Sequence, residues 1–374
     1  MVQRRDFPTG GAVGAEDLVG REHVLKELFE RVYTQGNSVV LSAPRQTGKT
    51  SVVAELVRRV RKAKGMAVSV DCSTATSADD LAELIAAKTY DEASGLRNAF
   101  ARLGDLVRNV PVPTLYQTDA DIALAFHSPQ RQMPTTQKLA KAFALADRIA
   151  EEKKVRTVVV YDELPTVRRL SPRVLDQLRA ELQHANKQTS YIFMGSETGM
   201  LNALFKDRRR MTFRLGVPLE LPAPTDTEWV RYIEDRFRTL GLPLAQSEAQ
   251  HLVTFTGAHP RDLMEACQHL LTLRKLDPST ARALEVAEEK TYVGLQRNFE
   301  LVWDLIDEPR GTRLTAVRIA TGQPVYGRGR EAKATKRTVD KLMNEGIVRQ
   351  LGRGRFEFTE PLFAEHVRRI SSRS

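Results

Sequence analysis

Hydrophobic and polar positions follow two kinds of pattern in the first 222 residues. Short, almost wholly apolar runs end in polar turns, and between them apolar residues recur every three or four positions. Apolar runs of this length predict buried strands, and the periodic stretches predict helices. The predicted strands are 38–42, 66–71, 156–161, 190–194 and 212–221. Strands that alternate with helices indicate an α/β fold with a parallel sheet flanked by helices.

Beyond Pro222 the strand pattern stops. Residues 226–240, 247–255 and 260–273 have helical spacing, which predicts a helical lid after the sheet. We therefore expect four parts: a flexible, Gly-rich N-terminus at 1–16, an α/β core at 17–222, the lid at 223–295 and a C-terminal domain at 296–374. Residues 110–134 match neither pattern, and an irregular loop, a partner site and part of the core all remain open for them.

The last domain has a pattern of its own. An amphipathic helix is predicted at 300–307, with Leu301, Val302, Leu305 and Ile306 on one face, followed by helices at 314–320 and 333–344. Residues 347–351 and 355–359 then predict a hairpin across the Gly352-Arg353-Gly354 turn. Three helices followed by a hairpin are the outline of a winged-helix domain.

Positive charge is concentrated in this domain. The chain has a net charge of +10, and residues 310–374 contain 15 Lys/Arg and 6 Asp/Glu, an excess of +9. Such a patch indicates a polyanion such as double-stranded DNA, although a solvated face that keeps the protein soluble, or a protein-interaction module, remains open. In a winged helix the predicted DNA contacts are Lys333, Lys336, Arg337 and Lys341 on the third helix, and Arg353 and Arg355 on the wing.

Composition bears on the cellular compartment in which the protein is expected. No apolar run approaches the roughly 18 residues of a membrane span, and the N-terminus lacks the apolar core of a signal peptide. Cys72 and Cys267 are far apart and match no metal-binding spacing. We expect them to be buried free thiols in a reducing compartment, and the protein to be cytoplasmic, without membrane contact.

The turn after the first strand contains a phosphate-binding motif. Residues 43–50, APRQTGKT, match G-x-x-x-x-G-K-[ST] except that Ala43 replaces the first glycine, and a strand and a helix flank them as the motif requires. Backbone N–H groups of such a loop hold phosphate oxygens, the lysine reaches the β and γ phosphates, and the threonine hydroxyl binds Mg²⁺. The predicted ATP-binding residues of the loop are Pro44, Arg45, Gln46, Thr47, Gly48, Lys49, Thr50 and Ser51.

Two acids end the third strand, where ligands bind in α/β proteins. The run VVVYDE places Asp162 and Glu163 at the carboxyl edge of the sheet. With the phosphate loop, Asp162 is expected to hold Mg²⁺ through water together with Thr50, and Glu163 to act as general base on the attacking water. The sequence therefore predicts ATP and Mg²⁺ as ligands.

The fourth strand ends in Gly195-Ser196-Glu197. If this strand lies between the phosphate-loop strand and the acidic strand, Ser196 faces the γ-phosphate and becomes a candidate sensor. A simple helix N-cap explains the same serine equally well.

With these motifs the chain resembles the archaeal-type ATPases of the STAND/AAA+ group, which tend to end in a winged helix. The resemblance spans roughly residues 17–370 and depends on LVGRE at 18–22, APRQTGKTS, VVVYDE, YIFMGSETGMLNALF and TGAHP at 256–260, in this order. It implies that Val19, Gly20 and Arg21 pack by the adenine, and that His259 and Pro260 touch the base or ribose. It also offers Arg214 as a γ-phosphate contact. A surface strand position for Arg214 and a helix-entry role for His259 are the alternatives.

Three functions follow from these motifs. The first is an ATPase whose nucleotide state sets the posture of the winged helix and thereby its contact with DNA or a protein partner, with an arginine supplied in trans if the protein forms a homo-oligomer. The second is a low-turnover ATP-dependent switch or scaffold, which the Ala43 departure keeps open. The third is a transcription regulator that reads sequence through the winged helix.

Overall fold

The computed structural model describes most of the chain. The described residues are 6–43, 47–94, 112–117, 122–127, 134–182, 188–195, 216–277, 280, 282–306, 312–326 and 330–372. Five of the singled-out residues, Pro44, Arg45, Gln46, Ser196 and Arg214, lie outside these ranges, and only the backbone of Lys333 is described.

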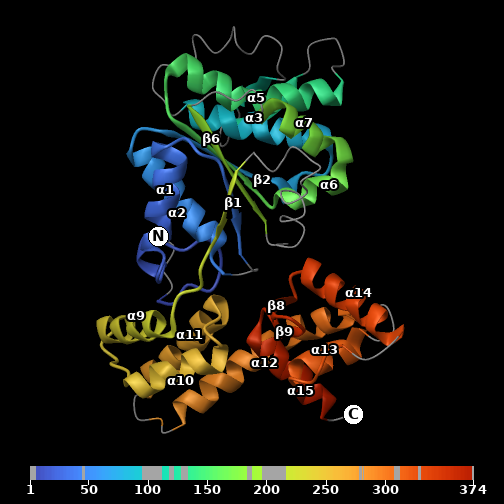
Figure 1. The fold of residues 1–374 in the computed structure, drawn as a ribbon. Coiled ribbons are helices and arrows are strands. Elements are labelled where there is room, and N and C mark those ends of the chain that lie inside the picture. The colour runs from blue at the N-terminus through green and yellow to red at the C-terminus, as the bar shows by residue number, and fades with distance from the viewer. Residues whose placement is uncertain are drawn as a thin grey trace.

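A five-stranded parallel sheet forms the α/β core (Figure 1). Its strands are β1 (Val39–Ser42), β2 (Met66–Asp71), β5 (Thr157–Asp162), β6 (Thr189–Gly195) and β7 (Val217–Glu220), in the order β2-β5-β6-β1-β7. β5 and β6 are buried along their lengths apart from Asp162, as expected for apolar strands covered on both faces. The predicted parallel sheet of a P-loop NTPase is confirmed, and β6 separates the phosphate-loop strand β1 from the acidic strand β5 as expected.

Helices cover both faces of this sheet. One face packs against α3 (Ala78–Ser94), α5 (Thr135–Lys153) and α7 (Pro172–Leu182), which contribute Ile85, Phe143 and Leu178 to a single core. The other face packs against α1 (Glu22–Phe29) and α2 (Lys49–Lys62). The short helix α6 (Val167–Leu170) follows β5. The carboxyl ends of the strands therefore meet at one edge, beside the start of α2.

Residues 112–117 and 122–127 form a separate pair of antiparallel strands. These are β3 (Val112–Gln117) and β4 (Ile122–His127), and Leu115 lies opposite Leu124 in the register. The sequence had left this stretch unassigned between loop, partner site and core. In its described part the backbone is a two-stranded sheet distinct from the parallel one.

The helical lid follows β7. It consists of α9 (Asp226–Thr239), α10 (Gln246–Thr256), α11 (Pro260–Leu276) and the first half of α12 (Ala283–Ile306). These helices enclose their own apolar core, in which Ile233, Leu252 and Leu270 are fully buried. A capping box between Thr225 and Glu228 starts α9.

The helix α12 joins the lid to the C-terminal domain without a break. It is 24 residues long, about 36 Å at the usual rise of an α-helix. Ala287 packs in the lid core, whereas Leu295 and Phe299 pack in the core of the C-terminal domain. The boundary expected at 295/296 thus falls inside one continuous helix, and the two domains share a rigid element.

The rest of the C-terminal domain is formed by α13 (Thr312–Ala320), α14 (Arg330–Asn344), the hairpin β8 (Val348–Gly352) and β9 (Arg355–Phe358), and α15 (Pro361–Ser371). The order of helices and hairpin matches the sequence pattern, with α15 added. One detail was wrong: Leu301 is 58% exposed, because it lies two positions beyond the core residue Phe299 and therefore points to the other side of α12.

Residues 6–14 are also ordered against the lid, although the sequence suggested a flexible lead-in there. The Phe7 ring is fully buried in the lid core beside Phe237. In the described part of the chain, no helix combines the length and apolar character needed to cross a membrane. Both cysteines are buried free thiols.

Candidate nucleotide site

The phosphate loop connects β1 to α2 at the carboxyl edge of the sheet. Gly48 precedes α2 with φ +88°, a left-handed backbone that favours glycine. The Lys49 side chain is almost fully buried, and its Nζ donates a hydrogen bond to the carbonyl of Ala43, 2.9 Å away. The ammonium group therefore lies at the base of the loop, where it can reach a phosphate held above the start of α2.

The acid after β5 lies against the start of α2. Thr50 Oγ1 donates to Asp162 Oδ2 at 3.4 Å, and Asp162 Oδ1 accepts the Glu163 backbone N–H at 2.8 Å. Burial raises the pKa of Asp162 above its ordinary value, with the negative charges of Glu163 and Asp71 adding to the effect. The structure thus brings Thr50 and Asp162 together at the carboxyl edge of the sheet.

Glu163 adopts an unusual backbone conformation. Its φ of +48° and ψ of +38° are left-handed, which costs a side-chain-bearing residue about 1–2 kcal/mol. Its carbonyl accepts hydrogen bonds from the backbone N–H and the hydroxyl of Thr166, the latter at 2.6 Å. This turn redirects the chain after β5 and places Glu163 on the wall of a cavity.

A third acid lies at the same edge, and the sequence reading had not assigned it a role. Asp71 ends β2 directly opposite Asp162 in the β2–β5 register. Its carboxylate accepts hydrogen bonds from the Ser73 backbone N–H at 2.9 Å and from the Ser73 hydroxyl at 2.7 Å, and Ser73 lines the cavity. Burial, together with the acids at this edge, raises the pKa of the Cys72 thiol. The sequence does contain a signal for Asp71, because an acidic residue ends this strand as Asp162 ends its neighbour.

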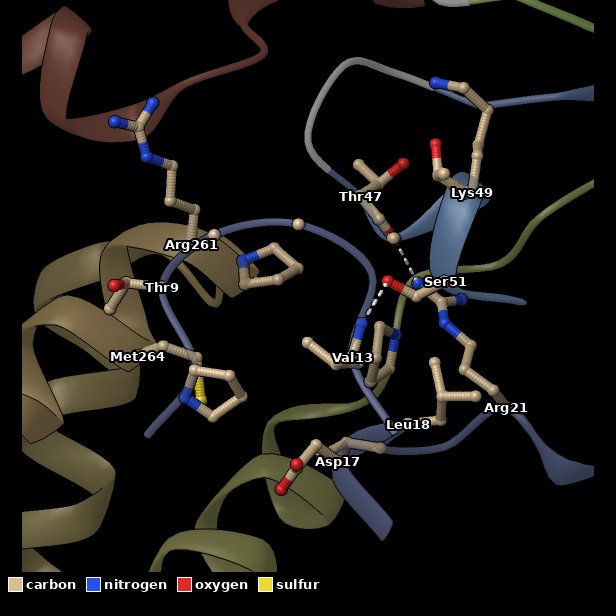
Figure 2. Close-up of a pocket in the computed structure, with 18 of the residues that line it drawn as sticks. Thr9, Val13, Asp17, Leu18, Arg21, Thr47, Lys49, Ser51, Arg261 and Met264 are labelled. Atoms are coloured by element: carbon tan, nitrogen blue, oxygen red, sulfur yellow. Dashed lines mark hydrogen bonds between the residues drawn. The ribbon is translucent and has the colours of Figure 1, made fainter. Parts of the chain in front are cut away.

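Lys49, Thr50 and Glu163 line one cavity of about 770 Å³, within the size range of small-molecule sites. It lies between the α/β core, the lid and the N-terminal segment (Figure 2). The lining residues from the core and its loops are Asp17, Leu18, Val19, Arg21, Thr47, Gly48, Lys49, Thr50, Ser51, Ser73, Glu163, Thr166 and Arg169. Those from the lid and its connection are Pro224, Trp229, Pro260, Arg261 and Met264.

The cavity has an apolar end and a charged end. Leu18, Val19, Trp229 and Met264 supply the apolar surface. The phosphate loop and Glu163 form the charged end. An apolar slot that continues into a cationic loop suits a nucleotide, whose base is flat and largely apolar and whose phosphates are anionic.

Arg21 ties the apolar end to the phosphate loop. It is almost fully buried, and Nη2 donates to the carbonyl of Thr47 at 2.8 Å. Burial lowers its pKa to about 10, partly offset by the charge of Glu228. The adjacent Gly20 has φ +65°, and a methyl group there would lie 2.7 Å from the Glu228 carboxylate. Residues 19–21, which we call the 19–21 box, therefore contact both the phosphate loop and the lid.

In the lid, Pro260 and Arg261 line the cavity, but His259 does not. The imidazole of His259 is buried, with Nδ1 3.0 Å from Asp262 Oδ2, within ion-pair distance but without hydrogen-bond geometry. The expected base or ribose contact through His259 is therefore not seen in the described site, because the ring packs inside the lid at the start of α11. Arg261, one residue beyond the predicted pair, faces the site instead.

Sequence reasoning missed four further cavity features. Arg261 had a weak signal, a cation at a helix start next to Pro260. The N-terminal segment also had a signal, because the aromatic Phe7 stands among polar residues and indicates that this segment packs against another part of the protein. Trp229 and Arg169 had none, because only the packing of lid and core brings them to the cavity.

A second charged surface lies on the C-terminal domain. Lys336 and Arg337 on α14, and Arg353 and Arg355 on the β8–β9 hairpin, are exposed. Lys341 is half-buried, with its ammonium 3.9 Å from Glu345. Arg349 on β8 forms an ion pair with Glu357 across the hairpin. The candidate contacts with described side chains are thus divided between one helix and one hairpin.

Comparison with known proteins gives one family match, in the α/β core. Residues 17–193 match the family model described as AAA ATPase domain, a segment that contains the phosphate loop, Asp162 and Glu163. No curated protein matches the sequence.

Solved structures resemble the whole chain in fold. The Walker-type ATPase of Pyrococcus abyssi is 16% identical with a TM-score of 0.66, covering 97% of this chain and 99% of that one. The ORC2 protein of Aeropyrum pernix, in ADPNP–ADP complexes, is 15% identical with a TM-score of 0.60 and 99% coverage of both chains. Cdc6p of Pyrobaculum aerophilum is 14% identical with a TM-score of 0.50 and 98% coverage of both. The chain thus contains a match to the AAA ATPase domain at residues 17–193 and shares its overall fold with these three proteins.

Proposed function

We propose that this protein binds ATP with Mg²⁺ in the cavity between core and lid and hydrolyses it. The observation on which the proposal depends is the convergence of Lys49, Thr50 and Glu163 on one cavity, with Asp162 in contact with Thr50. These residues come from two segments that are far apart in the sequence. The match of residues 17–193 to the AAA ATPase domain supports the same activity.

The residues present fit a magnesium ion. Thr50 and Asp162 offer oxygen ligands, which Mg²⁺ prefers, and their side chains are already in contact. Thr50 would bind the ion directly and Asp162 through water. When bound, Mg²⁺ would supply positive charge that neutralises the phosphates.

The chain's own residues supply the remaining chemistry. Lys49, released from its hydrogen bond to Ala43, holds the phosphate oxygens. Glu163 accepts a proton from the water that attacks the terminal phosphorus, and the Thr166 hydrogen bonds keep its backbone in place. Arg169 from the core and Arg261 from the lid approach the cavity from two different elements. They offset negative charge that grows on the terminal phosphate in the transition state.

Glu163→Gln tests this proposal. The amide keeps the size of the side chain but cannot accept the proton. Turnover is expected to fall by about 10²–10⁴-fold, the usual contribution of a general base, while the dissociation constant for MgATP stays within about threefold. The assignment would be refuted if the wild-type protein did not bind MgATP, or if the wild-type and Glu163→Gln proteins turned over ATP equally fast.

We further propose that the nucleotide state sets the position of the C-terminal domain. ATP would draw the lid toward the core through Arg261, and α12 would transmit this motion because it belongs to both the lid core and the C-terminal core. Pro361 of α15 also packs against Gly257 at the end of α10. The C-terminal domain is proposed to act as a winged helix that contacts double-stranded DNA through α14 and the β8–β9 hairpin.

A low-turnover switch is the second candidate function. The N-terminal segment contributes part of the cavity wall, and slow release of a bound nucleotide would favour a long-lived state over rapid cycling. A rate of ATP hydrolysis that is much higher in a single turnover than at steady state would favour the switch.

A further inference from the structure

The N-terminal segment 6–14, which we call the strap, is fixed to the lid at one end. The Phe7 side chain is fully buried, with its ring centroid 5.2 Å from that of Phe237 and 6.5 Å from that of Tyr232. The Phe7 N–H donates to Gln268 Oε1 at 3.3 Å. An aromatic ring buried in this way is a strong anchor, because its removal leaves an apolar cavity.

Polar contacts reinforce this anchor. The carbonyl of Asp6 accepts a hydrogen bond from Arg236 Nε at 2.8 Å, and its carboxylate pairs with Lys275 at 2.7 Å. After the strap, Asp17 accepts a hydrogen bond from the hydroxyl of Tyr232 at 2.8 Å. The lid therefore holds the start of the strap and, at Asp17, the chain just beyond its end.

Between these ends the strap crosses to the core. The Val13 N–H donates to the hydroxyl of Ser51 in the first turn of α2, at 3.1 Å (Figure 2). This hydrogen bond joins the strap to the phosphate-loop helix. The strap thus connects the two bodies on either side of the cavity.

The strap also lines the cavity. Its contributing residues are Pro8, Thr9, Gly10, Gly11 and Val13. Gly11 has φ +73°, and a methyl group built at either glycine would meet no other atom within 4 Å. The cavity is therefore bounded on this side by thin backbone. In Figure 2, Thr9 lies on the same side as Arg261 and Met264 of the lid, whereas Val13 faces the phosphate-loop helix.

We propose that the strap is a wall of the nucleotide site, and that it controls how fast a nucleoside diphosphate leaves. This inference rests on the proposed function. The strap covers the base and sugar of the bound nucleotide, and release requires either the Phe7 anchor or the Val13–Ser51 hydrogen bond to open. Phe7 is then a positioning residue that never touches the ligand.

The test measures dissociation of a fluorescent ADP analogue from the full-length protein by stopped flow. Phe7→Ala is expected to speed dissociation at least tenfold, and Phe7→Leu, which keeps an apolar anchor, to restore most of the wild-type rate. Leu270→Ala is the matched control, because Leu270 is buried in the same lid core but does not belong to the strap. Melting temperatures of both alanine variants are recorded, so that general loosening of the lid can be separated from loss of the anchor.

The outcomes separate the two proposals. If the wild-type protein takes up no nucleotide, the proposed function itself fails. If it binds ADP but Phe7→Ala releases it no faster than Leu270→Ala, only the strap assignment is overturned. Hydrogen exchange gives a second readout: bound ADP is expected to slow exchange in residues 8–14, and unchanged exchange there would also overturn the assignment.

Discussion

Thr50 Oγ1 lies 3.4 Å from Asp162 Oδ2, although 112 residues separate them in the chain. The contact places the first turn of α2 against the carboxyl end of β5, two elements that belong to different motifs of the sequence. A divalent cation held by these two oxygens would complete the charge balance at this edge of the sheet.

Asp162→Asn is expected to stabilise the empty protein while it disables the site. Burial raises the pKa of Asp162. A carboxyl whose pKa is raised by folding favours the folded state below its unfolded pKa of about 3.9, and this benefit is lost as pH rises through the folded value. At neutral pH the charged form is therefore unfavourable. The variant is expected to melt higher than wild type at pH 7, with the difference shrinking at pH 4, and its ATP turnover to fall by about 10²-fold or more.

This prediction has a built-in control in Mg²⁺. Added magnesium and ATP are expected to raise the melting temperature of the wild-type protein more than that of Asp162→Asn. A variant that melts lower than wild type at pH 7 would contradict the inferred cost of the buried charge.

Arg261→Ala is expected to weaken ATP binding more than ADP binding. Arg261 lines the cavity from the lid, and a charged hydrogen bond to the terminal phosphate contributes about 1.5–3 kcal/mol, or roughly tenfold to a hundredfold in affinity. Calorimetric titration with both nucleotides measures the difference. Arg231→Ala removes an exposed lid arginine and should change neither affinity; equal losses for ATP and ADP would place Arg261 away from the terminal phosphate.

Gly20→Ala is expected to destabilise the protein more than Gly241→Ala. Both glycines have positive φ, but a methyl group at Gly20 would meet the Glu228 carboxylate, whereas one at Gly241 meets open space. The backbone strain shared by both costs about 1–2 kcal/mol. Chemical denaturation gives the free energies of unfolding. The excess loss in Gly20→Ala, together with weaker nucleotide binding, would report the contact between the 19–21 box and the lid; equal losses would show that Glu228 simply moves aside.

Val293→Pro is expected to uncouple the C-terminal domain from the lid. Val293 lies on α12 and is 55% exposed, so the substitution breaks the helix without emptying either core, at a cost of about 3 kcal/mol. The difference in DNA affinity between the ATP and ADP states, measured by fluorescence anisotropy, is expected to disappear. Val293→Ala keeps the helix and should preserve it. Retention of the difference in the proline variant would exclude α12 as the connection.

The double variant Arg353→Ala, Arg355→Ala is expected to weaken DNA binding and flatten its salt dependence. Each lost phosphate contact lowers the slope of log affinity against log salt by about 0.9, so a change of roughly 2 is expected. Arg349→Ala removes an arginine already paired with Glu357 and should leave the slope nearly unchanged. An unaltered slope in the double variant would favour a protein partner for this domain.

Local patterns were sufficient for much of the fold. The buried strands could be predicted because a strand that is covered on both faces of a sheet has apolar residues at almost every position. The phosphate loop could be predicted because its chemistry depends on consecutive residues, from Ala43 to Thr50. Asp162 and Glu163 followed from the rule that ligands meet the carboxyl ends of parallel strands.

Contacts between distant segments could not be predicted in this way. Phe7 stands in a polar stretch, and nothing near it in the sequence indicates a place in the lid core. Leu301 fits an apolar helical stripe, yet it points away from the side of α12 that buries Phe299 and stays exposed. His259 follows a recognisable lid motif, but packing at the start of α11 turns its ring inward and leaves Arg261 facing the cavity.

The sequence by itself therefore predicted the chemistry that we propose for the phosphate loop, where neighbouring residues act together through the backbone they share. The tertiary structure decided the opposite end and its enclosure by the lid and the strap. These depend on apolar side chains that gain stability only when distant segments bury them together. The pattern of a segment shows that such a surface exists, but its partner is chosen by the packing of the whole chain.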